Sequence, residues 1–273
     1  MKLLMVSSLS ALIVFFACSK KESAESQTSD HQLPTTKEIS YVVDTTTMKG
    51  YIAYPQSQEG KKPGILVVHE WWGHNDYARK RADMLADLGY VALAVDMYGD
   101  GKQAAHPQDA QKFAMSVMGN FETAKARFSK ALETLKADPR VDPDKIGAIG
   151  YCFGGSVVLA MVNSGLDLQA AGAFHAGLQL PVQPQNNQIK TKVLVCNGGA
   201  DPLVTKDDIA NFKKSMEDAG IDYKFITYDG AQHAFTNPGA TELGKKFNLP
   251  LSYNEKADQK SWEELKKFLA SAL

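Results

Sequence analysis

From about Lys37 onward, short continuous apolar runs alternate along the chain with longer segments whose apolar positions recur every three or four residues. A short apolar run is expected of a strand buried on both faces, and the longer spacing is expected of a helix with one buried side. The predicted buried strands are residues 64–69, 90–95, 146–149, 170–174, 192–196 and 223–228. The predicted helices are residues 76–88, 107–118, 121–136, 154–163, 205–219 and 255–269.

This alternation predicts an α/β fold with a mainly parallel central sheet and helices on both faces. Residues 39–43 and 49–54 are predicted to enter the sheet as an antiparallel hairpin, and residues 137–144 are predicted to be a turn-rich link. Residues 236–253 follow no regular pattern and are a candidate lid, whose mobility the sequence leaves open. No repeat or linker divides the patterned region, so we expect one domain over residues 37–273.

The first 17 residues differ from the rest of the chain. A basic start at Lys2 is followed by the apolar stretch 3–17, which is too short to span a bilayer comfortably and is typical of a signal peptide. The stretch ends at Cys18 in a pattern that resembles the bacterial lipobox, although Phe15 stands where leucine is commonest. We therefore predict a lipoprotein-type signal peptide over 1–17 with a lipid on Cys18. A plain secretory signal and a membrane-anchor helix are the alternatives.

Residues 18–36 are rich in Ser, Lys, Glu and Gln, a composition typical of a flexible tether. A lipid on Cys18 would hold the protein at a membrane without a hydrophobic helix in the mature chain. We therefore expect an exported protein, lipid-anchored in a bacterial cell envelope and facing the periplasm or the surface. The sequence leaves open which membrane and which leaflet hold it.

Composition and net charge limit the classes of partner that we expect this chain to bind. The 273 residues are 44% hydrophobic and 22% charged, with a formal net charge of −1. No basic excess points to nucleic acid, and no acidic block suggests a solvating tail. The expected partners are thus a small-molecule substrate and, through Cys18, a membrane. The oligomeric state stays open.

The segment 150–154, Gly-Tyr-Cys-Phe-Gly, joins the predicted strand at 146–149 to the predicted helix at 154–163. Its glycines suit a strained strand-turn-helix that lifts Cys152 above the sheet, and a helix N-terminus favours a thiolate. Cys152 is therefore a candidate nucleophile. The alternative is an ordinary turn in which Cys152 is a small buried apolar residue.

A nucleophile of this kind needs a base and a carboxylate that orients the base. Asp201 follows the predicted strand at 192–196, and His233 follows the predicted strand at 223–228. Taken alone, Asp201 is compatible with a turn or capping residue, and His233 with a solvated loop histidine. Their order after Cys152, and the position of all three just past the carboxyl ends of strands, favour a catalytic triad.

With these residues in place, the chain from about Ile39 to Leu269 resembles the dienelactone hydrolase family. The resemblance implies an α/β-hydrolase fold and a Cys-Asp-His triad at Cys152, Asp201 and His233. The family also carries a glutamate in a pattern like His-Glu-x-x-Gly, which Glu70 matches here. The resemblance implies that Glu70 contacts the resting thiol and moves away when substrate enters.

The backbone N–H groups of Phe153 and Trp71 are the predicted oxyanion-hole donors. Dienelactone hydrolases proper hold a substrate carboxylate with arginines, one of them four residues after the catalytic histidine. That position is Asn237 here, and Arg79 and Arg81 are expected to be solvated, so a dianionic lactone is not favoured. Trp71, Trp72, Tyr98 and Phe153 suggest an apolar or aromatic pocket, with ordinary core packing as the alternative. We therefore include Trp72, Tyr98 and Asn237 in a candidate substrate pocket.

The remaining histidines and Cys196 are expected to be structural. His69 and His74 are five residues apart rather than the four of a helical zinc motif, so no metal or cofactor is expected. His175 could face the cleft, but packing as a hydrogen-bonded histidine is favoured. Cys196 and Cys152 end strands that are not neighbours, about 10 Å apart and beyond the reach of a disulfide.

Together these features predict a hydrolase that cleaves a carboxylic ester or lactone through an acyl intermediate on Cys152. A thiolate leaves a tetrahedral intermediate more readily than an amide nitrogen does, so esters and lactones are favoured over peptides. The alternative is a non-catalytic cell-envelope binding protein that keeps the hydrolase fold. The natural substrate is not evident from the sequence.

Overall fold

The alternating strands and helices form one eight-stranded sheet in the computed structural model, which describes residues 34–57, 59–184 and 188–273. The predicted signal peptide, Cys18 and most of the predicted tether lie outside the described residues. No helix within the described ranges is long and apolar enough to cross a membrane.

The predicted elements appear in the predicted order. The strands are β1 (Thr35–Val43), β2 (Thr46–Tyr54), β3 (Lys62–Val68), β4 (Val91–Val95), β5 (Val141–Tyr151), β6 (Ala170–Phe174), β7 (Lys192–Gly198) and β8 (Tyr223–Tyr228). The helices are α1 (Asp76–Asp87), α2 (Pro107–Met118), α3 (Phe121–Lys136), α4 (Phe153–Asn163), α5 (Lys206–Asp218), α6 (Ala240–Phe247) and α7 (Glu255–Ala272).

The sheet has the strand order β1-β2-β4-β3-β5-β6-β7-β8. Strand β2 runs antiparallel to β1 and β4, and the pairs from β4 through β8 are all parallel. The antiparallel entry hairpin and the mainly parallel sheet are therefore confirmed.

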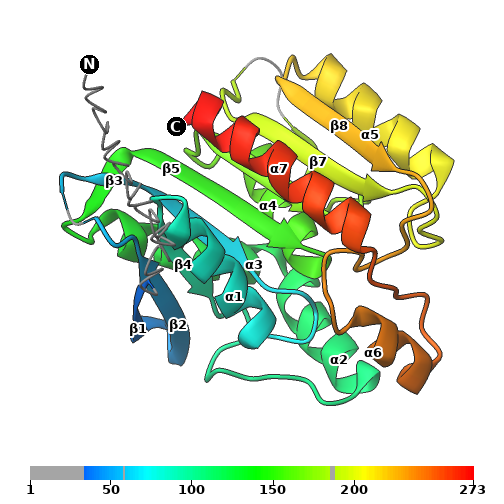
Figure 1. Cartoon of the computed structure of the whole chain (residues 1–273), viewed down its shortest axis with the longest axis horizontal. Coiled ribbons are helices and arrows are strands. Elements are labelled where there is room, and N and C mark those ends of the chain that lie inside the picture. The colour runs from blue at the N-terminus through cyan, green and yellow to red at the C-terminus, as the bar shows by residue number, and fades with distance from the viewer. Residues whose placement is uncertain (1–33, 58, 185–187) are drawn as a thin grey trace, which may run out of the picture. The chain divides into compact units, whose positions relative to one another are not determined.

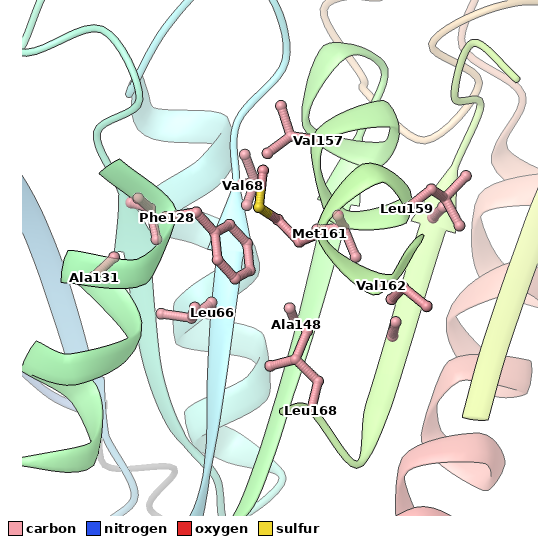
Figure 2. Packing of buried hydrophobic residues seen from close by; sticks show 14 of the residues in the cluster. Leu66, Val68, Phe128, Ala131, Ala148, Val157, Leu159, Met161, Val162 and Leu168 are labelled. Atoms are coloured by element: carbon pink, nitrogen blue, oxygen red, sulfur yellow. The ribbon is translucent and has the colours of Figure 1, made fainter. Parts of the chain in front are cut away.

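Helices cover both faces of the sheet, as the continuous apolar strands require. Helices α1 and α7 pack on the face seen in front in Figure 1, through side chains such as Leu85 and Leu265. Helices α3, α4 and α5 pack on the other face, where Figure 2 shows Phe128 of α3 among Leu66 of β3 and Met161 of α4. These apolar contacts fix the strands whose ends carry the candidate site.

The carboxyl ends of the central strands meet at one edge of the sheet. Val68 pairs with Gly150, Tyr151 pairs with Phe174, and Phe174 pairs with Cys196. The loops that follow β3, β5, β6, β7 and β8 therefore emerge side by side, in the position where open α/β sheets build their sites.

Two predicted segments differ from the structure. Strand β5 begins at Val141, within the predicted turn-rich link, because Lys62 and Pro63 pair with Val141 and Asp142 ahead of a register shift. The polar residues at this point are typical of a turn, although they belong to the first part of the strand. The irregular segment 236–253 contains the helix α6, whose Phe247 stacks on Trp72 with ring centroids 5.9 Å apart.

Candidate active site

Cys152 lies at a sharp turn between β5 and α4. Its backbone has φ 53° and ψ −117°, a conformation that a non-glycine residue adopts only when its surroundings hold it there. A Cβ on Gly150 would lie 2.1 Å from the carbonyl oxygen of Gly154, and a Cβ on Gly154 would lie 2.3 Å from the carbonyl oxygen of Val68. The two glycines are therefore required for the close approach of backbone segments at this turn. The Cys152 side chain does not cap α4 and stays partly exposed.

His233 and Asp201 form a buried pair in the loops after β8 and β7. Nδ1 of His233 lies 2.7 Å from Oδ2 of Asp201, and Oδ1 of Asp201 accepts a 2.9 Å hydrogen bond from the Leu203 amide. Asp201 thus orients the imidazole and also caps its own turn. Burial disfavours the imidazolium, but the charge of Cys152 and hydrogen bonds with Asp201 and Cys152 outweigh burial and raise the pKa of His233 to about 10.

Glu70 lies buried just after β3, and its nearest polar partner is Asn237. Oε2 accepts a 2.6 Å hydrogen bond from the Asn237 amide, whereas Oε1 has no hydrogen-bond partner. Burial raises the pKa of Glu70 to about 7, although Asn237, His233 and Arg81 each lower it in part. The described contacts therefore pair Glu70 with Asn237 and the thiol with His233, whereas the resemblance implies a contact between Glu70 and the resting thiol.

The two predicted oxyanion donors follow β3 and Cys152. Phe153 is the first residue of α4, so its N–H is one of the amides at a helix start that have no partner within the helix. The Tyr98 hydroxyl donates a 2.9 Å hydrogen bond to the Trp71 carbonyl. Nε2 of His69 accepts a 3.2 Å hydrogen bond from the Met97 amide. The ring proton is therefore on Nδ1, which donates a 2.5 Å hydrogen bond to the Glu70 carbonyl. These bonds fix the backbone on both sides of Trp71.

The aromatic residues assigned to the substrate pocket are mostly buried. Trp72 packs between Trp71 and Phe247, and Tyr98 packs against Phe153 and His69. Trp71 itself is only partly buried. The contacts of Trp72 and Tyr98 are thus those of core packing, and their part in a substrate pocket stays a prediction.

Arg81 is buried, and the expectation that it is solvated is wrong. Its guanidinium lies over the rings of Tyr77, Tyr151 and Trp262, and Nη2 forms a 2.6 Å ion pair with Asp258. The sequence held a sign of this, because position 81 falls on the apolar stripe of α1 with Ala78 and Leu85. Arg79, by contrast, is partly exposed and pairs with Glu38.

His175 has hydrogen-bond partners on both ring nitrogens. Nδ1 lies 3.1 Å from the Cys152 amide nitrogen, and Nε2 lies 2.7 Å from Oγ1 of Thr236. The prediction that His175 packs as a hydrogen-bonded histidine is confirmed. Thr236 is not among the predicted site residues, because nothing in its local pattern reveals a partner 61 residues away.

Cys196 is buried at the end of β7, and both it and Cys152 are free thiols. Strand β6 lies between β5 and β7, which keeps the two cysteines apart. Burial raises the pKa of Cys196 to about 12, so that thiol stays neutral. Among the described residues, no group of three or more His, Cys, Asp or Glu side chains is arranged to hold a metal ion.

Known proteins resemble this chain over most of its length. The model of the dienelactone hydrolase family matches residues 48–273. Protein usf of Aquifex pyrophilus is 31% identical over 194 residues, which cover 70% of this chain and 82% of that protein.

Two solved structures are similar in sequence and in fold. The structure titled m3DLH is 36% identical with a TM-score of 0.83, covering 89% of this chain and 100% of that chain. The dienelactone hydrolase-like promiscuous phosphotriesterase P91, from metagenomic libraries, is 30% identical with a TM-score of 0.80, covering 88% and 99%. The predicted α/β-hydrolase fold is confirmed.

Proposed function

Since this chain belongs to the dienelactone hydrolase family and is a hydrolase of that kind, we propose that it cleaves a carboxylic ester or lactone through an acyl intermediate on Cys152. The observation that carries the proposal is the arrangement at the carboxyl edge of the sheet. His233 is fixed by Asp201 at 2.7 Å, and interaction with Cys152 raises the pKa of His233. A cysteine and an imidazolium in this relation form an ion pair in which the thiolate is the nucleophile.

The proposed reaction has two halves. The Cys152 thiolate attacks the substrate carbonyl carbon, and the resulting oxyanion accepts hydrogen bonds from the N–H groups of Phe153 and Trp71. The intermediate collapses with cleavage of the ester C–O bond, and the departing alkoxide takes a proton from the His233 imidazolium. A water molecule then gives its proton to neutral His233 as it attacks the thioester. Collapse of the second intermediate releases the carboxylic acid and regenerates the thiolate beside the imidazolium.

Asp201 has a positioning role in this scheme. As the acceptor for the Nδ1 proton, it keeps the Nε2 side of His233 directed at the reacting atoms and stabilises the imidazolium. Its own backbone turn is fixed by the bond from the Leu203 amide, which limits movement of the carboxylate.

We propose that the substrate is uncharged at the end near Asn237. The position where dienelactone hydrolases proper carry an arginine is occupied by Asn237, whose amide is already bonded to Glu70. Arg81 is buried in its ion pair with Asp258 and is not available as a replacement. A neutral ester or lactone leaves no substrate charge unpaired in this site.

Glu70 is proposed to tune the thiol. A carboxyl group whose pKa is near 7 changes charge around neutral pH. As an anion it disfavours a thiolate nearby, and as a neutral acid it does not. The hydrogen bond from Asn237 holds Glu70 in this position.

We further propose that the protein is a lipoprotein of a bacterial cell envelope, with a signal peptide over 1–17, a lipid on Cys18, a tether over 18–36 and the hydrolase domain over 37–273. The supporting observations are the apolar stretch that ends at Cys18 and the polar segment that follows. Cys18→Ser is expected to release the protein from membranes. Unchanged membrane association of that variant would contradict the proposal.

The likeness to P91 favours a phosphotriester as a second substrate class. The same thiolate and the same two N–H donors would serve attack at phosphorus, with the phosphoryl oxygen in place of the carbonyl oxygen. Release of an aryl alcohol from a neutral aryl phosphotriester, lost in Cys152→Ala, tests this activity.

The hydrolase proposal is tested by mass spectrometry of the protein mixed with an electrophilic aryl ester. We expect a time-dependent acyl adduct on Cys152. Absence of both adduct and turnover across a panel of neutral esters and lactones would favour a non-catalytic binding protein.

A further inference from the structure

The tautomer of His175 follows from its hydrogen bonds. A backbone amide can only donate, so the 3.1 Å contact from the Cys152 N–H makes Nδ1 of His175 the acceptor. The ring proton is then on Nε2, which donates to Oγ1 of Thr236 at 2.7 Å. Burial lowers the pKa of His175 well below 6.5, and the charges of His233 and Arg81 lower it further. The ring is therefore neutral with its proton on Nε2.

In His233 the Nδ1 atom carries a proton, whereas in His175 the Nδ1 atom accepts a hydrogen bond. Nδ1 of His233 faces Asp201, an anion that accepts the Nδ1 proton. The two rings are in edge contact, with centroids 5.4 Å apart and planes at 65°. The site thus contains two histidines held by two different partners. Asp201 orients the histidine that faces the thiol, and Thr236 orients the histidine that faces the backbone of the same cysteine.

The Cys152 amide has two acceptors at the end of the neighbouring strand β6, one on its last residue and one on the residue that follows. Its N–H points to the Phe174 carbonyl at 2.9 Å and to Nδ1 of His175 at 3.1 Å. A proton on Nδ1 would face the Cys152 N–H and repel it. The positive φ of Cys152 is strained, and strain of this kind persists only where several contacts hold it. The lone pair of His175 is one of those contacts.

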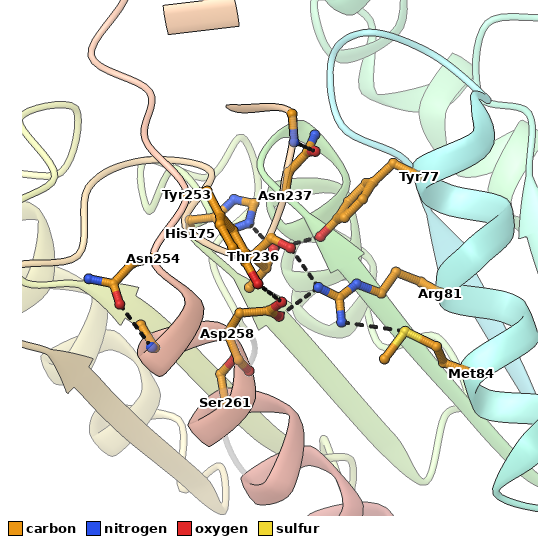
Figure 3. Close-up of polar contacts among 12 residues, drawn as sticks. Tyr77, Arg81, Met84, His175, Thr236, Asn237, Tyr253, Asn254, Asp258 and Ser261 are labelled. Carbon is orange, nitrogen blue, oxygen red and sulfur yellow. Dashed lines mark hydrogen bonds and ion pairs between the residues drawn. The ribbon is translucent and has the colours of Figure 1, made fainter. Parts of the chain in front are cut away.

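Thr236 is itself fixed from several directions. Its carbonyl accepts a 2.6 Å hydrogen bond from Nη2 of Arg81, which is ion-paired with Asp258 on α7. Its hydroxyl also lies 2.6 Å from the Tyr77 hydroxyl. Figure 3 shows Thr236 between His175 on one side and Tyr77 and Arg81 on the other. Thr236, His175 and Arg81 are buried, which limits competition from water for their hydrogen bonds.

We propose that Thr236 and His175 are positioning residues of the hydrolase, with the Thr236 hydroxyl fixing the Nε2-protonated tautomer of His175 so that Nδ1 holds the Cys152 backbone in its reactive conformation. The inference rests on the proposed function, because it assigns a role in presenting Cys152 as the nucleophile. Neither side chain touches the substrate in this account. Both act through the position of the thiol.

Two substitutions at Thr236 separate the hydroxyl from the shape of the side chain. Thr236→Val keeps the branched shape and removes the hydrogen bond, and we expect kcat for a neutral aryl ester to fall about 10- to 100-fold with KM nearly unchanged, as for other partners that orient an imidazole. Thr236→Ser keeps the hydroxyl and is expected to retain kcat within about threefold of the wild type. Equal kcat values in Thr236→Val and the wild type would overturn the proposal, as would equal losses in Thr236→Val and Thr236→Ser.

A matched pair at His175 tests the backbone contact. In His175→Asn the amide oxygen takes the place of Nδ1 and can still accept from the Cys152 N–H. In His175→Gln the amide reaches Thr236 but leaves the Cys152 N–H without this acceptor. The proposal predicts a higher kcat for Asn than for Gln, although Gln fills the volume of His better. The reverse order would indicate a packing role and overturn the proposal.

The tautomer is measured directly by ¹⁵N NMR of histidine-labelled protein, a readout that does not depend on turnover. We expect His175 to be protonated on Nε2 alone in the wild type and in Thr236→Ser, and to lose this preference in Thr236→Val. A wild-type His175 that carries its proton on Nδ1 would overturn the inference. Failure of the proposed function is distinguished from this result, because the wild type would then form no acyl adduct on Cys152 whatever the tautomer.

Discussion

The side-chain amide of Asn237 donates a 2.6 Å hydrogen bond to the carboxylate of Glu70, which lies 167 positions earlier in the chain. The bond joins the loop after β8, which carries His233, to the loop after β3, which carries Glu70 and Trp71. The resemblance implies that Asn237 stands where dienelactone hydrolases proper carry a carboxylate-binding arginine, and we propose on that basis that the substrate is uncharged there. One contact therefore bears on both the charge of Glu70 and the choice of substrate.

Removal of this donor is expected to destabilise the fold. Asn237→Ala leaves Oε2 of Glu70 without its hydrogen-bond partner in a buried site, and we predict a loss of about 1–3 kcal/mol in the free energy of unfolding at pH 8. Urea denaturation measures the change. In a Glu70→Gln background the same substitution is expected to cost less, because no buried anion is then left unpaired. An equal cost in both backgrounds would show that the Asn237–Glu70 bond is not the cause.

Glu70 is predicted to make stability depend on pH. Its folded pKa of about 7 lies above its ordinary value of 4.5, so the folded protein binds this proton more tightly than the unfolded chain does. The resulting stabilisation is complete below about pH 4.5 and is lost as the pH rises through about 7. Glu70→Gln has no titrating carboxyl group at this position, so its stability does not change with pH for this reason. Relative to the wild type, Glu70→Gln is therefore expected to gain about 3 kcal/mol between pH 4.5 and pH 8.

The measurement is the unfolding free energy of both proteins at these two pH values. Other titrating groups are common to wild type and variant, so the difference between the two proteins isolates the carboxyl group. A parallel pH dependence in the two proteins would contradict the raised pKa of Glu70.

Arg81 and Arg79 offer a matched pair on α1. Arg81 is buried in an ion pair with Asp258, whereas Arg79 is partly exposed and pairs with the exposed Glu38. Arg81→Met leaves the Asp258 carboxylate unpaired at a mostly buried site, and we predict a loss of about 3–5 kcal/mol in the free energy of unfolding. Arg79→Met is expected to change it by less than about 1 kcal/mol. Similar losses in the two variants would refute the structural role given to Arg81.

Structural features that depend on neighbouring residues can be predicted from the sequence, whereas those that depend on distant partners cannot. The continuous apolar strands and the turn with Gly150 and Gly154 are determined by neighbouring residues, and both features were predicted. Strand β5 starts earlier than expected, because the polar residues after Val141 look like a turn and only pairing with β3 makes them a strand.

The contacts around the candidate site depend on distant partners. Asn237 was expected in a substrate pocket, and its bond to Glu70 is invisible until the loops after β3 and β8 are placed together. Arg81 was expected in solvent, because charged residues on helices usually are, and only its aromatic neighbours and Asp258 explain its burial. The hydrogen bond between Thr236 and His175 likewise forms only when the end of β6 and the loop after β8 meet.

Cys152 is the proposed nucleophile, and the steady-state hydrolysis of a small neutral aryl ester by Cys152→Ala beside the wild type tests this role. The substitution removes the attacking atom and leaves Asp201, His233 and the N–H donors in place. We predict a fall in kcat of at least about 1,000-fold, with an unfolding free energy close to that of the wild type. Undiminished turnover by Cys152→Ala would contradict the account.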